Sequence, residues 1–142
     1  MIAVEIVDTV YLIAYLKPSD PLHTRAVEII ESLGNHRKIS QASLVELDLL
    51  MKSRGFTVDE RLKTWMLLEK IIPTEAIEPV NPQDLAIAVI LVEKHGLDYF
   101  DALVAAQCIT RNAKPLTTDK EIIEVTSKES KEKLVKEWKI TP

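Results

Sequence analysis

Four acidic residues, in four separate parts of the chain, are the residues best suited to chemistry. Asp8 follows the apolar segment IAVEIV, and Asp119 follows the short segment KPLTT. Glu46 lies within the apolar run SLVELDLL, and Asp101 lies in LDYFDALVAA. A carboxylate in apolar sequence needs a partner if it is buried, and carboxylate oxygens are the ligands that Mg²⁺ and Mn²⁺ prefer. If the four acids converge in the fold, they predict a site for a divalent cation.

Each acid also has a purely structural interpretation. Asp8 is of a residue type that commonly caps the helix after a strand. Ser43 and Glu46 have the spacing of a capping box, and Thr118 and Glu121 repeat that spacing. Spacing along the chain does not distinguish helix caps from metal ligands, because it does not show which residues meet in space. Both interpretations therefore stay open at this point.

An alternation of strands and helices is expected to position these acids. β-Branched and apolar residues predict strands over residues 2–7, 38–41, 76–80 and 114–117, and an edge strand over 138–141. Apolar spacing and end signals predict helices over residues 9–16, 20–33, 43–54, 57–72, 82–95, 98–109, 119–125 and 128–138. Asp20 is expected to cap the second of these helices, with Pro21 at its first position. The alternation predicts an α/β fold with a mainly parallel sheet, whose sites lie at the carboxyl ends of the strands.

Length and composition predict one globular domain over residues 1–142. The chain has 46% hydrophobic and 28% charged residues, which is enough to build a sizeable core. One cysteine excludes an internal disulfide, and the three scattered histidines lack the spacing of zinc ligands. A net charge of −4 does not itself indicate nucleic-acid binding, but if the four acids are grouped in a metal site, the rest of the chain is formally neutral. Five basic residues would then be candidates to line an approach for a phosphate backbone: Lys17, Arg25, Lys52, Arg54 and Arg111.

A secreted or membrane-spanning protein is not expected. The N-terminal apolar segment lacks a basic start and is interrupted by Glu5 and Asp8, unlike a signal peptide. The longest uninterrupted apolar run, Leu85 to Val92, has eight residues and is too short to cross a bilayer. We therefore expect a cytoplasmic protein.

The order of these motifs resembles the PIN domain family, and in particular its small toxin ribonucleases of the VapC type. The resemblance rests on D-T at Asp8, on S-x-x-E ending at Glu46, on DYFDALVAA and on LTTD ending at Asp119. It covers nearly the whole chain, and its most specific part is GLDYFDALVAA followed by PLTTD. Val10 takes a place where relatives often carry a small polar residue, a departure that affects one polar contact but none of the carboxylates.

The resemblance implies a three-layer α/β/α sandwich with a mainly parallel central sheet. It also implies an endoribonuclease that hydrolyses RNA phosphodiester bonds with the help of Mg²⁺ or Mn²⁺. The family's catalytic and metal-binding acids map onto Asp8, Glu46, Asp101 and Asp119. Three further residues would support these acids without binding the metal directly: Thr9, Asp98 and Thr117. We expect Asp8 and Asp101 to be the most direct ligands, with the other two acids completing the site or holding a second ion.

Two protein partners are expected. The predicted helices over residues 57–72 and 82–95 carry more apolar residues than one sheet face would cover, which favours a homodimer, as the resemblance also does. A VapC-like toxin would also bind a small antitoxin, which would insert a segment near the acids. An antitoxin arginine facing the carboxylates would suit their charge.

Rival interpretations fit the residues less well. A haloacid-dehalogenase-like phosphatase requires a second aspartate two residues after Asp8, where this chain has Val10. A receiver-like domain requires paired acids at the end of the first strand, and that pairing is missing as well. A catalytically inactive PIN-like module that binds RNA or a protein is the remaining alternative. It would not need to keep all four acids.

Overall fold

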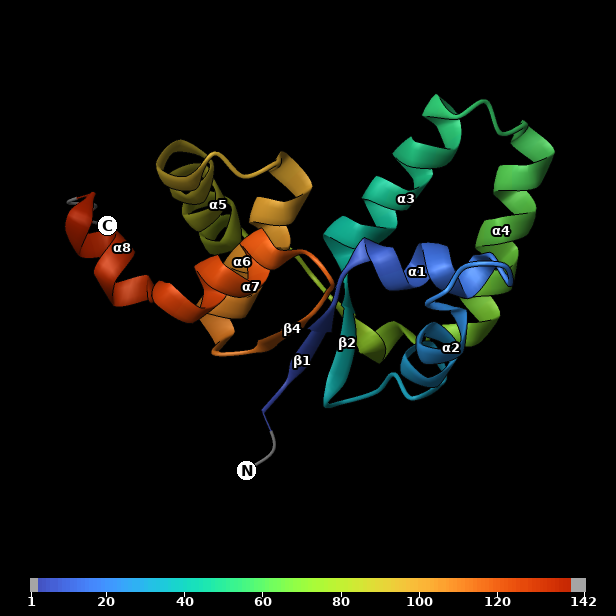
Figure 1. The fold of residues 1–142 in the computed structure, drawn as a ribbon, viewed down its shortest axis with the longest axis horizontal. Helices are drawn as coiled ribbons and strands as arrows, with labels where there is room; N and C mark the ends of the chain where they lie inside the picture. The colour runs from blue at the N-terminus through green and yellow to red at the C-terminus, as the bar shows by residue number, and fades with distance from the viewer. Residues whose placement is uncertain (1–2, 139–142) are drawn as a thin grey trace.

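A short parallel sheet lies in the middle of the computed structural model, which describes residues 3–138. Its four strands are arranged in the order β3-β2-β1-β4, and every neighbouring pair is parallel (Figure 1). The strands are β1 (Glu5–Val7), β2 (Arg37–Ser40), β3 (Ile77–Glu78) and β4 (Lys114–Leu116). The chain places β2 on one side of β1 and β4 on the other. The carboxyl end of β1, where Asp8 lies, is therefore flanked by the ends of two strands from distant parts of the sequence.

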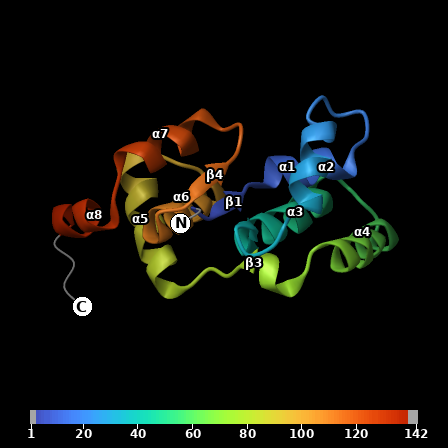
Figure 2. The ribbon, with the colours of Figure 1, turned by 90° about the horizontal axis from the view of Figure 1, so that it is seen from below.

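Helices cover the two faces of this sheet. The first half of the chain supplies α1 (Thr9–Leu16), α2 (His23–Glu31), α3 (Gln41–Ser53), α4 (Val58–Ile71) and the short 3₁₀ helix η1 (Thr74–Ala76). The second half supplies α5 (Pro82–His95), α6 (Tyr99–Arg111), α7 (Lys120–Lys128) and α8 (Lys131–Glu137). Figures 1 and 2 show α1 to α4 on one side of the strands and α5 to α8 on the other. The predicted α/β/α arrangement with a parallel sheet is confirmed.

The core follows from the alternation of side chains along β1. Val7 packs into a buried cluster with residues of α1 to α4, such as Leu12 and Ile29. Ile6 points to the opposite face and packs against Val104 and Cys108 of α6. Both strand residues are completely buried, and burying a side chain of this size stabilises a fold by about 1.5–3 kcal/mol. The two faces of one short strand thus join the two halves of the protein.

Several helix ends are the predicted ones. Asp8 caps α1, Asp98 caps α6, and Thr57 caps α4 within a reciprocal capping box. Gly96 ends α5 with a left-handed backbone conformation (φ +68°), which glycine adopts without steric cost.

The predicted start of α2 is wrong. Asp20 does not cap this helix, because its Oδ1 accepts a hydrogen bond from Leu22 N, 2.8 Å away, in a local turn. Pro21 therefore lies in that turn, and α2 begins at His23.

Both proposed capping boxes near the acids are also wrong. Ser40 caps α3, so the helix begins at Gln41, and Ser43 lies inside it rather than at its start. Asp119, and not Thr118, caps α7. Glu46 is consequently not held by a helix start and needs another explanation.

Two observations bear on the termini and on membranes. The predicted edge strand over residues 138–141 falls largely outside the described residues, of which Trp138 is the last. Within residues 3–138, no helix is long and apolar enough to cross a membrane.

Candidate active site

Asp8 lies at the end of β1 with both carboxylate oxygens engaged. Its Oδ1 accepts the cap hydrogen bond from Thr9 N at 2.8 Å, and its Oδ2 accepts a hydrogen bond from Thr117 Oγ1 at 2.7 Å. The side chain is buried, and burial raises its pKa, although the two hydrogen bonds oppose that effect. Each carboxylate oxygen has more than one lone pair, so the cap leaves Asp8 able to bind a cation as well.

Glu46 is joined to the segment that follows Asp8. The hydroxyl of Thr9 donates a hydrogen bond to Glu46 Oε1, so an α1 residue fixes an α3 carboxylate. Ser43 strengthens this contact between elements, because its Oγ donates a 3.4 Å hydrogen bond to the backbone oxygen of Val7. Burial raises the pKa of Glu46, and the nearby charges of Asp8 and Asp98 add to the shift.

Asp101 is the acid most affected by the others. Asp98 caps α6 by accepting a hydrogen bond from Phe100 N at 3.1 Å, and Asp101 lies in the first turn of that helix. Partial burial and the charges of four other carboxylates raise the pKa of Asp101 to about 7. These carboxylates belong to Asp119, Asp8, Asp98 and Glu46. Residues from four parts of the chain therefore share one region of negative potential.

Asp119 completes this group from the end of β4. Its Oδ1 accepts hydrogen bonds from Glu121 N at 2.8 Å and Ile122 N at 3.4 Å, which makes it the cap of α7. Its own backbone N–H donates to Thr117 Oγ1 at 3.0 Å. The Thr117 hydroxyl therefore connects Asp119 with Asp8.

The donor set suits a hard divalent cation. Within residues 3–138, no group of three or more His, Cys, Asp or Glu side chains is arranged to hold a metal ion. Mg²⁺, however, usually keeps several waters and binds one or two carboxylates directly. Burial raises the pKa of Asp101, the charges of the neighbouring acids add to the shift, and a bound cation would offset those charges. The residues present thus fit a hydrated Mg²⁺ or Mn²⁺ ion.

The candidate basic residues separate in the structure. Lys52 lines a pocket of about 560 Å³ together with Glu46, Asp98 and Phe100, directly beside the acids. Lys17 and Arg54 line a different, mainly apolar groove between α1, α3 and α4, and Arg25 is paired with Glu28 at 2.7 Å.

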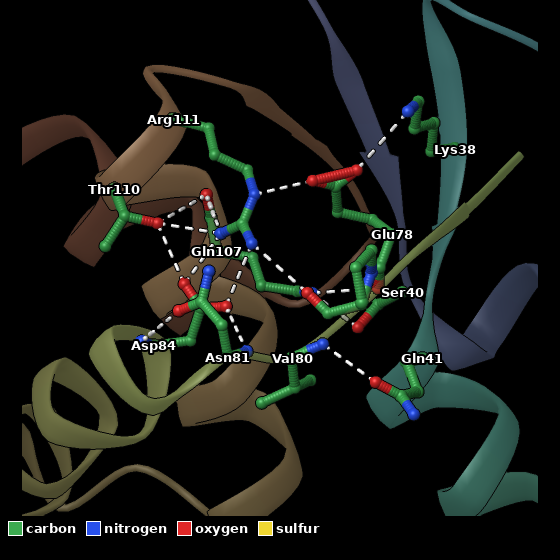
Figure 3. A network of polar contacts seen from close by, with 11 residues as sticks. Lys38, Ser40, Gln41, Glu78, Val80, Asn81, Asp84, Gln107, Thr110 and Arg111 are labelled. Carbon is green, nitrogen blue, oxygen red and sulfur yellow. Dashed lines mark hydrogen bonds and ion pairs between the residues drawn. The ribbon is translucent and has the colours of Figure 1, made fainter. Parts of the chain in front are cut away.

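Arg111 has a different role from the expected one. It forms ion pairs with Asp84 at 2.6 Å and with Glu78 at 2.7 Å, in a polar network between α5, α6 and β3 (Figure 3). Among the five basic candidates, Lys52 is therefore the residue placed beside the acids.

Two contacts of the site could not be predicted from the spacing of residues in the sequence. The Thr9–Glu46 bond joins residues 37 positions apart, and the Ser43–Val7 bond joins residues 36 positions apart. Val10 packs against the apolar core, so it supplies no polar contact, as predicted from its type.

Comparisons with known proteins agree with this geometry. The sequence profile of the PIN domain matches residues 6–128. The chain belongs to the PIN domain family. No curated protein sequence matches it.

Several solved structures are similar to this chain in fold. The sarcin-ricin loop cleaving toxin VapC20 of Mycobacterium tuberculosis is 18% identical, with a TM-score of 0.64 over 83% of this chain and 92% of that chain. FitAcB of Neisseria gonorrhoeae is 20% identical, with a TM-score of 0.65 over 87% and 93%. VapBC2 of Rickettsia felis, bound to a promoter DNA fragment, is 16% identical, with a TM-score of 0.59 over 82% and 87%. At these identities the likeness concerns the fold alone.

Proposed function

We propose that this PIN domain is an endoribonuclease of the toxin–antitoxin kind that hydrolyses RNA phosphodiester bonds at Asp8, Glu46, Asp101 and Asp119. The observation that carries the proposal is the convergence of acids from four parts of the chain: Thr117 Oγ1 joins Asp8 to the backbone of Asp119, Thr9 joins Glu46 to the end of β1, and burial together with the charges of the other acids raises the pKa of Asp101 to about 7. A bound cation stabilises the ionised form of acids that repel one another in this way. A bound Mg²⁺ or Mn²⁺ ion would lower the pKa of its water and offset the negative charge of the phosphate.

The residues of the chain have separate tasks in this proposal. Asp8 and Asp101 are the most direct ligands, because one is fixed at both oxygens and the other carries the strongest repulsion. Thr9 engages Oε1 of Glu46, so we assign Oε2 to orienting the attacking water. Thr117 holds Asp8 and the backbone of Asp119 at a fixed separation, which keeps the acids in place before the substrate binds.

The pocket beside the acids is our candidate path for RNA. Lys52 offers a positive charge for a phosphate next to the scissile one, and Phe100 offers an apolar surface for a base or sugar. A ribonuclease of this kind would act in the cytoplasm, where its substrates are translated or processed.

Two protein partners belong to the proposal. A similar fold occurs in a toxin–antitoxin complex, which supports an antitoxin partner. An antitoxin arginine that faces the acids would suit their negative charge. Apolar side chains remain exposed on α4 and α5, which supports a homodimer: Val58, Leu62, Met66, Leu67, Leu85, Val89 and Val92.

Cleavage of a mixed RNA substrate, with Mn²⁺ and then with EDTA, tests the function. We expect cleavage only with the metal, and a loss of at least 100-fold in the Asp8→Asn and Asp101→Asn variants. The matched control is Asp59→Asn, which removes an exposed α4 carboxylate paired with Lys63. Retained cleavage in both site variants contradicts the assignment, and RNA binding without cleavage in the unmodified protein points instead to an inactive binding module.

A further inference from the structure

Gln107 is a completely buried amide in the otherwise apolar segment ALVAAQCI of α6. Its Nε2 donates hydrogen bonds to the backbone oxygens of Glu78 and Pro79, each at 3.0 Å. Its Oε1 accepts a 2.5 Å hydrogen bond from the hydroxyl of Ser40 (Figure 3). Two carbonyl acceptors on one side and a hydroxyl donor on the other fix the orientation of the amide. All three hydrogen bonds of this side-chain amide are made with residues outside α6.

Ser40 connects this amide to the start of α3. Its Oγ accepts a hydrogen bond from Ala42 N at 3.1 Å, which makes Ser40 the N-terminal cap of that helix. The same oxygen donates to Gln107, so both the donor and the acceptor capacity of one buried hydroxyl are used. The Ser40–Gln107 bond is therefore a direct link between the helix that carries Glu46 and the helix that carries Asp101.

The link lies at the same distance along each helix from its acid. Glu46 follows Ser40 by six residues, and Asp101 precedes Gln107 by six residues. Six residues correspond to about 9 Å of helix axis. Figure 1 shows α3 leading away from the sheet and α6 running back beside it, with the first turns of α6 beyond the edge from which α3 starts. A rotation of about 5° at the link would move an acid about 9 Å away by roughly 0.8 Å.

Metal sites do not tolerate such displacements. Ligand distances in a metal site are kept within about 0.2 Å. We propose that Gln107 is a positioning residue which, through Ser40, fixes the separation of Glu46 and Asp101 and thereby sets the affinity of the site for a divalent cation. The inference rests on the proposed function, since it assumes that Asp101 binds a metal ion and that Glu46 holds a water of the same site. Gln107 does not touch the metal or the substrate.

Thr110 offers a matched control on the same helix. Its hydroxyl donates to Asp84 Oδ1 at 2.9 Å and to the Gln107 backbone oxygen at 3.3 Å. The contact with Asp84 ties α6 to α5, the contact with the Gln107 backbone lies within α6, and neither involves α3. Thr110→Val removes the hydroxyl with little change in volume, so it perturbs the polar network without cutting the link to Ser40.

Mn²⁺ binding, measured by electron paramagnetic resonance, tests the inference independently of RNA cleavage. Gln107→Met keeps the length of the side chain and removes the amide. We expect it to raise the half-saturating Mn²⁺ concentration at least 10-fold, at a temperature where circular dichroism shows each variant folded. Thr110→Val should change that concentration less than 2-fold. Equal Mn²⁺ binding by the two variants overturns the positioning role, whereas an unmodified protein that binds no Mn²⁺ overturns the proposed function itself.

A second pair of variants keeps the inference testable if Gln107→Met does not fold. Ser40→Ala leaves the bonds from Gln107 to Glu78 and Pro79 in place and removes the link to α3 together with the cap hydrogen bond from Ala42 N. We expect the same 10-fold rise in the half-saturating Mn²⁺ concentration, and its reversal in Ser40→Thr, which restores a hydroxyl. Adding Gln107→Met to Ser40→Ala should weaken Mn²⁺ binding less than Gln107→Met does alone, because the Ser40–Gln107 bond is already absent in Ser40→Ala. Unchanged Mn²⁺ binding in Ser40→Ala contradicts the inference.

Discussion

The hydroxyl of Thr117 lies 2.7 Å from Oδ2 of Asp8, although the two residues are 109 positions apart in the chain. This contact joins the carboxyl ends of β1 and β4, and it donates a hydrogen bond to the charged form of the carboxylate. Such a bond lowers the pKa of Asp8 against the opposing effect of burial. Thr117 therefore helps to keep a buried acid ionised and ready to bind a cation.

Replacing Thr117 should weaken the site without removing any acid. Thr117→Val leaves the charged form of Asp8 with one hydrogen bond fewer, a loss of about 1.5–3 kcal/mol for a bond to a charged group. We expect Mn²⁺ affinity at pH 7 to fall about 10-fold or more and to recover as the pH rises. Isothermal titration calorimetry at several pH values measures this change. Thr117→Ser retains the hydroxyl and should bind as the unmodified protein does; equal losses in both variants would exclude the hydrogen bond as the cause.

The pH dependence of stability should carry the signature of Asp101. Its pKa in the folded protein is about 7, above the ordinary aspartate value of 3.8, so the folded state holds a proton that the unfolded chain releases. This group therefore lowers stability as the pH rises from about 4 to about 7. In EDTA, Asp101→Asn should raise the melting temperature by a few degrees at pH 7.5 and leave it unchanged at pH 4.

Differential scanning calorimetry of both proteins measures this difference. Addition of Mn²⁺ at pH 7.5 should stabilise the unmodified protein and have little effect on the variant. A variant that gains equally at both pH values would mean that charge repulsion at Asp101 is not the source of the effect.

Lys52 should contribute to RNA binding but not to metal binding. Removing one phosphate contact weakens binding modestly and reduces its salt dependence. We expect Lys52→Ala to raise KM for RNA about 3- to 10-fold at low salt, with kcat at saturating RNA and Mn²⁺ affinity unchanged. Steady-state cleavage at 50 and 200 mM salt measures both parameters. Lys128→Ala removes an exposed charge paired with Glu124 and is the control; an identical effect in the two variants would assign the loss to net charge.

Arg111 should matter for stability rather than for activity. It pairs with the fully buried carboxylate of Asp84 and with Glu78, and its charge holds the pKa of Asp84 low despite burial. Arg111→Met leaves a buried charge without its partner, which costs about 3–5 kcal/mol. Urea denaturation at pH 7 measures this loss, and Asp84→Leu/Arg111→Met should recover part of it by removing both charges. A loss below 1 kcal/mol in Arg111→Met would contradict the structural role.

The elements of the fold follow from local sequence more closely than their ends do. Short apolar segments predict all four described strands, and the longer segments between them predict the helices. The strands are recognisable because a strand that is buried on both faces of a sheet consists mainly of apolar residues. Helix ends depend on single hydrogen bonds. Ser40 and Ser43 are equally good caps by residue type, and only the end of β2 decides that Ser40 is the cap.

The candidate site is harder to predict from the sequence than the fold is, because its contacts join residues that are far apart in the chain. The four acids are visible as carboxylates in apolar surroundings, and the family pattern identifies them together. The bond from Thr9 to Glu46 and the bond from Ser40 to Gln107 depend on how α1, α3 and α6 pack. Gln107 has one local signal, a polar amide within an apolar helix, but that signal does not name its partners.

The position of β4 next to β1 has a consequence for protein synthesis. Asp8 leaves the ribosome early, whereas Thr117 and Asp119 are added more than a hundred residues later. The four acids cannot meet until the nascent chain includes β4 and the start of α7. Translation products that stop before residue 119 therefore lack a complete acidic site, and under the proposed function such unfinished chains would not cleave RNA.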